Sequence, residues 1–68
     1  MQIIFETRKF EAEYGHAPHG RGWWWFTFEG MDYCSSGTYT EAKNNCKKYI
    51  RSIAPHGYID PVYVTVET

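Results

Sequence analysis

Five side chains in this sequence have the chemistry to bind a metal ion or to act as a nucleophile and base: His16, His19, Cys34, Cys46 and His56. The H-x-x-H spacing of the first two suits zinc only if two further ligands converge on the ion. The cysteines lack the C-x-x-C spacing of a small zinc module. A thiolate and an imidazole can also pair in catalysis, but no third residue is placed to orient such a base. We therefore expect no metal site, no cofactor and no enzymatic activity.

The two cysteines leave one structural alternative, a Cys34–Cys46 disulfide that would tie the strand before the helix to the middle of the helix. Such bonds are rare in reducing compartments. The N-terminus lacks the order of a signal peptide, and no stretch approaches the roughly 18 apolar residues that span a bilayer. We expect a cytoplasmic protein that does not enter membranes, with both thiols reduced.

We expect aromatic side chains to form a large part of the hydrophobic core of this chain. Its 68 residues include three tryptophans, six tyrosines and four phenylalanines. A chain of this size is near the lower limit for a single hydrophobic core, and each buried ring removes about 150–250 Å² from water. We expect one complete domain over residues 1–68. The formal net charge of −1 argues against a globally basic nucleic-acid binder or a polyanionic mimic.

Alternating apolar residues predict the strands. Residues 2–14 read as extended chain, with a change of parity near Thr7 and Arg8 that indicates a bulge or bend. Residues 15–22 are rich in glycine and predict a long hairpin loop. Residues 23–29 are the strongest strand, followed by a turn at 29–32 and a short strand at 33–35. Residues 62–66 form a last strand.

One helix is well defined by the sequence. Thr38 and Glu41 have the T-x-x-E spacing of a capping box. The apolar positions that follow trace one stripe at helical period. They are Tyr39, Ala42, Cys46, Tyr49, Ile50 and Ile53. Pro55 and Gly57 are expected to end the helix.

These elements predict an α+β domain of order β-β-(β)-α-β, a three- to four-stranded antiparallel sheet with one helix packed on one face. A single helix covers only one face of such a sheet. We assign Trp24, Phe26, Phe28 and the valines of residues 62–66 to the helix side. The opposite face, called the open face below, then carries Trp23, Trp25 and Tyr63.

An exposed aromatic patch usually marks a contact surface. We therefore expect Trp23, Trp25 and Tyr63 to anchor a protein partner, with Arg21 and the loop histidines at the rim. A second copy of the chain is one such partner. The alternative is that the N-terminal segment or residues 15–22 fold over the rings as a second small core.

A basic helix face is the second candidate surface. It carries Lys43, Lys47, Lys48 and Arg51, against Glu41 as the acidic residue of the helix. Basic residues near the end of a helix also complement its dipole and keep a small protein in solution. The functional alternative is docking on an acidic protein surface or on a phosphate backbone.

The strand, turn and G-T-x-x-E-A helix start within residues 22–53 resemble the HicB-like antitoxin domain, and in outline small phage-encoded enzyme inhibitors. The sheet also resembles, in part, three-stranded-sheet DNA-binding domains, although it offers little arginine to neutralise phosphates. Both resemblances imply binding rather than catalysis. We expect a non-enzymatic protein-binding module, of the kind that phages and mobile elements use as inhibitors or adaptors. A nucleic-acid-binding domain and a HicB-like antitoxin are the alternatives.

Overall fold

The structure is a computed structural model that describes residues 2–53 and 60–68. Its elements run in the order β1 (Ile3–Glu6), α1 (Arg8–Tyr14), β2 (Arg21–Phe28), β3 (Met31–Thr38), α2 (Tyr39–Ile53) and β4 (Val62–Val66). The predicted α+β class, with a helix on one face of a sheet, is confirmed. Two features differ from the prediction: the sheet is mixed, and a second helix follows the first strand.

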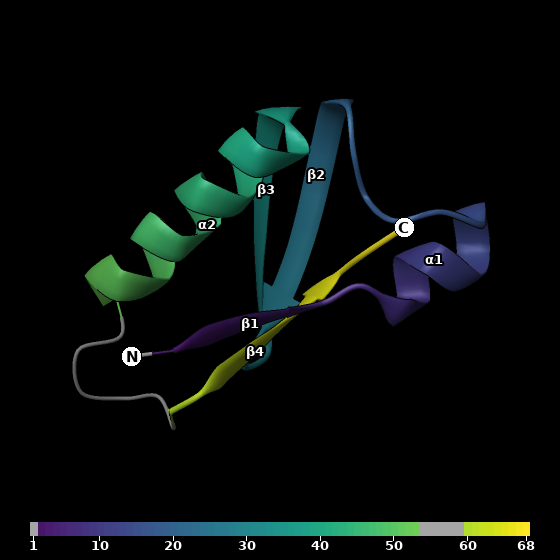
Figure 1. Ribbon diagram of the computed structural model, residues 1–68. Coiled ribbons are helices and arrows are strands. Elements are labelled where there is room, and N and C mark those ends of the chain that lie inside the picture. The colour runs from purple at the N-terminus through teal and green to yellow at the C-terminus, as the bar shows by residue number, and fades with distance from the viewer. Residues whose placement is uncertain (1, 54–59) are drawn as a thin grey trace.

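The four strands lie in the order β1-β4-β2-β3. Strands β2 and β3 form a long antiparallel hairpin, whereas β1 and β4 pair in parallel. The two pairs join through a short antiparallel contact, Phe26 with Val66 and Thr27 with Thr65. In Figure 1 the β1–β4 pair runs obliquely across the lower end of the β2–β3 hairpin. The expected all-antiparallel sheet was wrong because the first strand pairs with the last.

Residues 8–14 form helix α1 where extended chain was expected. Phe10 and Tyr14 are spaced i, i+4, so their rings meet on one side of the helix with centroids 4.5 Å apart. Gly15 ends the helix in the left-handed conformation, with φ 77°, and its N–H bonds to the Glu11 carbonyl at 2.8 Å. The parity change at Thr7 is therefore the end of β1 and the start of a helix.

The connections on both sides of β2 differ from the predicted ones, and β3 begins at Met31 and not at Tyr33. Residues 15–20 link α1 to β2, so they do not form a hairpin loop. The tight turn falls between β2 and β3, at Glu29 and Gly30, whose φ values are 49° and 75°. Two successive residues with positive φ match the twist of a two-residue hairpin.

Helix α2 begins with the predicted capping box. The Thr38 hydroxyl accepts the Glu41 N–H at 3.1 Å, and the Glu41 carboxylate accepts the Thr38 N–H at 3.0 Å. Ala42, Cys46 and Ile50 are fully buried along its inner stripe. Pro55 and Gly57, expected to end this helix, lie outside the described residues.

The core lies between α2 and one face of the sheet. Phe26, Phe28 and the three valines of β4 are almost completely buried there, as predicted. Trp24 is wedged between Phe10 of α1 and Tyr39 of α2, with ring centroids at 5.7 and 5.0 Å. Its indole N–H donates to the Gly37 carbonyl at 3.2 Å. Trp24 thus joins both helices to the hairpin.

Candidate functional site

The open face of the sheet carries large exposed aromatic side chains. Trp23 is 77 % exposed, Trp25 46 % and Tyr63 56 %. The period-2 alternation of β2 produces this arrangement, since Trp24 and Phe26 between and beside them point into the core. A second small core over these rings, the alternative reading of the sequence, is therefore wrong.

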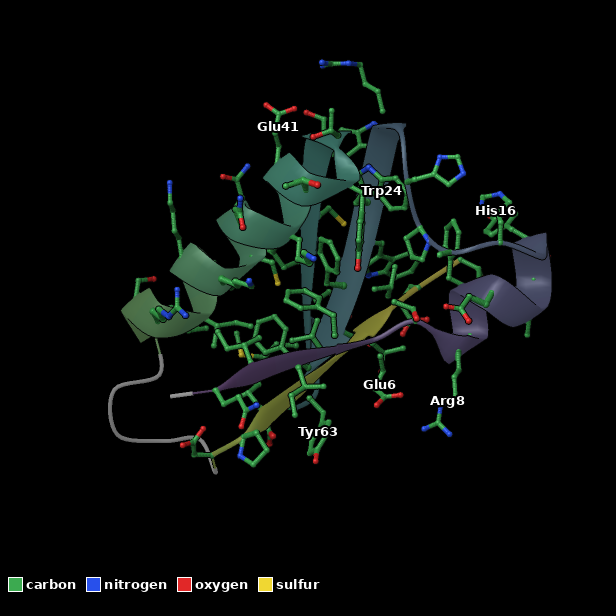
Figure 2. The ribbon with its side chains drawn as sticks, in the orientation of Figure 1. Glu6, Arg8, His16, Trp24, Glu41 and Tyr63 are labelled. Carbon is green, nitrogen blue, oxygen red and sulfur yellow. The ribbon has the colours of Figure 1, made fainter. Side chains whose placement is uncertain are left out.

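The structure brings the two tryptophans together but separates Tyr63 from them. Trp23 and Trp25 are neighbours on one face of β2 and lie opposite Ser36 and Cys34 of β3. Tyr63 belongs to the β1–β4 pair, beyond the Thr27–Thr65 contact between the two halves of the sheet. In Figure 2 its side chain points away from α2. The three rings share a face without forming one continuous patch.

A polar network lies beside Trp25. The Glu67 N–H donates to the Trp25 carbonyl at 2.8 Å, and the Glu67 carboxylate accepts the Thr27 hydroxyl at 2.6 Å. The same carboxylate forms an ion pair with Lys9 of α1. The bond from the Lys9 ammonium, and after it the bond from the Thr27 hydroxyl, lower the pKa of Glu67. Because Glu67 already has partners within the chain, it is committed to holding α1 against the sheet.

Arg21, the predicted rim residue, is the exposed first residue of β2 and lies on the same face as Trp23. The positive charge of Arg21 also affects Glu41, the capping-box residue at the start of α2. The pKa of Glu41 is lowered, first by the hydrogen bonds with Thr38 and further by the positive charge of Arg21. Arg21 thus lies near both the tryptophan pair and the start of α2.

The loop histidines lie beside α1. His16 packs edge-on against Phe10 at 5.7 Å, and its ring centroid is 4.7 Å from that of His19. The His16 Nδ1 contacts the Ala17 carbonyl at 2.8 Å. His56 lies outside the described residues. Among residues 2–53 and 60–68 no cluster of three or more histidine, cysteine or acidic side chains is arranged to hold a metal ion.

The two cysteines occupy opposite environments. Cys34 is exposed on the open face, Cys46 is buried on the inner side of α2, and both are free. Burial raises the pKa of the Cys46 thiol to about 12. Cys46 therefore stays protonated and packs as a small apolar side chain.

The basic helix face divides into two parts. The ammonium groups of Lys43 and Lys47 lie over the Phe5 ring, 5.9 and 6.0 Å from its centroid, and both side chains are half-buried. This is a cation–π arrangement that also shields the edge of the core. Lys48 and Arg51 are exposed. Half of the predicted basic face therefore packs against the protein itself.

A further candidate surface is the outer edge of β3, where Cys34 lies. No local pattern identifies an edge strand, because strand order depends on contacts between distant segments.

In the described part of the chain no pocket is found, and no helix there is long and apolar enough to cross a membrane.

The comparisons with known proteins give no relative to reason from. No protein-family model matches the chain, and neither curated proteins nor solved structures gave a significant match. The resemblance to HicB-like antitoxins stays a prediction. The function is therefore inferred from the surface geometry alone.

Proposed function

We propose that this protein is a non-enzymatic binding module for another protein, with Trp23 and Trp25 as its anchors. The observation that carries the proposal is the exposure of these rings, 77 % and 46 %, at neighbouring positions on one face of β2. Tryptophan is one of the residue types enriched among interface hot spots. An exposed pair of this kind is an apolar surface for a partner to cover.

The position of the pair within the fold favours rigid recognition. Between the two rings, Trp24 is locked into the core by Phe10, Tyr39 and the Gly37 carbonyl. On the other side of Trp25, the Glu67 backbone N–H fixes its carbonyl. The backbone that presents the tryptophans is therefore ordered before binding, which lowers the entropy cost of association.

The proposed mechanism is occlusion, in which the tryptophan pair covers a functional surface of its partner and thereby inhibits or recruits it. Arg21 adds a charged contact at the rim of the pair. Tyr63 provides a separate contact on the β1–β4 half of the sheet. The cytoplasmic location and the origin in a phage or mobile element expected from the sequence stay predictions.

The test is capture from lysate with tagged protein, with half of the lysate treated with nuclease. We expect wild-type protein and a Tyr14→Ala control, which removes an exposed ring on α1, to capture the same discrete protein from both halves. The double variant Trp23→Ala with Trp25→Ala keeps its thermal unfolding transition and loses that protein. Unchanged capture by the folded double variant would contradict the proposal. Capture only from untreated lysate would assign the function to nucleic acid and to Lys48 and Arg51.

A further inference from the structure

The outer edge of β3 is open to pairing. In the part of the chain that the structure describes, strand order places β3 at the margin of the sheet, next to β2 alone. It is eight residues long, twice the length of β1 at the opposite margin. An exposed edge strand of this length is a template for another strand.

The direction of its backbone groups follows from the β2–β4 contact. The Trp25 carbonyl accepts a bond from Glu67, so it points toward β4. In an antiparallel pair these directions alternate along the strand, so Trp24 points its N–H and C=O toward β3, where its partner is Ser35. Ser35 therefore faces β2, and the residues that alternate with it face outward. These are Asp32, Cys34 and Ser36, all with exposed side chains.

Among residues 2–53 and 60–68, little competes for these outward groups. The Ser36 carbonyl accepts a long bond, 3.3 Å, from the Ser35 hydroxyl. A carbonyl has two lone pairs and can accept a second bond. Beyond Ser36, the Thr38 N–H is already taken by the Glu41 carboxylate. The open stretch of edge is therefore residues 32–36.

We propose that two copies of the chain join through this edge, β3 to β3 and antiparallel, with a two-fold axis at Cys34. In this register Asp32 lies opposite the partner's Ser36, and Cys34 lies opposite the partner's Cys34. All three outward-facing residues then donate and accept hydrogen bonds across the interface. Shifting the register in either direction leaves one of these residues unpaired, or places it opposite the turn or opposite Thr38.

Charge complementarity favours a second copy as the occupant. The carboxylate of Asp32 meets a hydroxyl of the partner, and the two Asp32 side chains lie at opposite ends of the contact. On α2, Glu41, Asn45 and Lys48 share one exposed stripe by their i, i+4, i+7 spacing. The Asn45 amide donates to the Ser35 hydroxyl at 3.2 Å, so the stripe lies on the β3 side of α2.

The two-fold axis would place the second α2 antiparallel to the first. The Glu41 end of one stripe then approaches the Lys48 end of the other, twice, with Asn45 between them. The helices thus offer opposite charges, and the sheet edge offers a carboxylate facing a hydroxyl, in the same symmetric arrangement. The result is a continuous eight-stranded sheet, twice the four strands of one chain, whose open face carries both tryptophan pairs.

The first test places charged side chains at position 34, on the proposed two-fold axis. Cys34→Lys and Cys34→Glu each place like charges opposite each other in a homodimer, and we expect each variant alone to sediment as a monomer. Mixing the two variants restores a dimer, because lysine then faces glutamate. Ala12→Lys and Ala12→Glu, on the exposed side of α1, are the matched controls and stay dimeric like the wild type. Circular dichroism checks that every variant is folded.

Two further variants test the register and remain informative if position 34 does not tolerate charge. Ser36→Lys faces the partner's Asp32 and should tighten the dimer, whereas Ser36→Asp should weaken it. Two symmetric cross-strand pairs of this kind correspond to a change of about two- to thirtyfold in the dimer dissociation constant. The proposal is overturned by a wild-type monomer at every concentration up to its solubility limit. It is also overturned by folded Cys34 variants that stay dimeric alone or fail to pair when mixed, and by Ser36 variants that shift affinity in the same direction.

This pairing uses the edge of the sheet, whereas the proposed partner binding uses its open face. Although Cys34 and Ser36 lie opposite Trp25 and Trp23, the edge variants keep both tryptophans, and the tryptophan double variant keeps the backbone of the edge. Failure of one proposal therefore does not imply failure of the other.

Discussion

Trp23 and Trp24 are identical side chains at adjacent positions of one strand, yet 77 % of the first and 7 % of the second is exposed. Trp24 contacts Phe10 and Tyr39 and donates its indole N–H to Gly37. Trp23 lies opposite Ser36 on the other face. The comparison shows that one face of the sheet supplies the core, whereas the other face leaves its large aromatic side chains exposed.

The largest expected contrast between the two faces is in thiol reactivity. Cys34 on the open face should react rapidly with a maleimide or disulfide reagent under native conditions. Cys46 is buried with its pKa raised to about 12, so it should react only when the protein unfolds. For an unfolding free energy of about 5 kcal/mol this protects it by a factor of roughly 10³ or more. Mass spectrometry of the labelled peptides measures both rates. Equal rates would show that α2 opens locally.

The tryptophans give the next contrast. We expect Trp24→Ala to lower the free energy of unfolding by about 3–5 kcal/mol, because it leaves a cavity between the two helices. Trp23→Ala should change it by no more than about 0.5 kcal/mol, as is usual for an exposed side chain. Urea denaturation followed by far-UV circular dichroism measures both. A similar loss for both variants would mean that Trp23 also belongs to a core.

The smallest contrast concerns charge on the open face. The Lys9 ammonium and the Thr27 hydroxyl lower the pKa of Glu67 below 4.5, its usual value. Its stabilising contribution is therefore complete above pH 4.5 and is lost as the pH falls through the lower folded-state value. Lys9 is half exposed, so solvent screening limits the contribution to about 0.5 kcal/mol.

The corresponding experiment compares Lys9→Met with Glu13→Gln, which changes an exposed acid elsewhere on α1. In Lys9→Met the free energy of unfolding should fall less steeply as the pH drops from neutral to acid. In Glu13→Gln it should fall with nearly the slope of the wild type. If both variants keep the full slope, Glu67 does not contribute through its ion pair. The open face would then add little to folding by either aromatic or polar contacts.

Local patterns predicted the parts of the fold that local interactions determine. The cap at Thr38 and Glu41, the buried stripe of α2 and the two faces of β2 depend on residues a few positions apart. Helix α1 was missed because Phe10, Ala12 and Tyr14 fit a strand as well as a helix. Contact between Phe10 and Trp24, far apart in sequence, selects the helix.

The candidate surfaces were predicted as sets of residues but not as arrangements. Exposure of Trp23, Trp25 and Tyr63 followed from period-2 alternation. Their separation into two groups depends on the register of β2 against β4, which no local pattern specifies. The half-buried state of Lys43 and Lys47 depends in the same way on Phe5, which reaches α2 from the first strand.

The parallel pairing of β1 with β4 has a consequence for how the chain is made. A ribosome releases residues 3–6 well before residues 62–66, so β1 lacks its partner β4 until the residues of β4 have been made. The β2–β3 hairpin and α2 involve only nearby residues and can form while translation continues. During that interval Ile3, Ile4 and Phe5 are exposed to the cell, and a chain interrupted before residue 62 would display them permanently to chaperones and proteases.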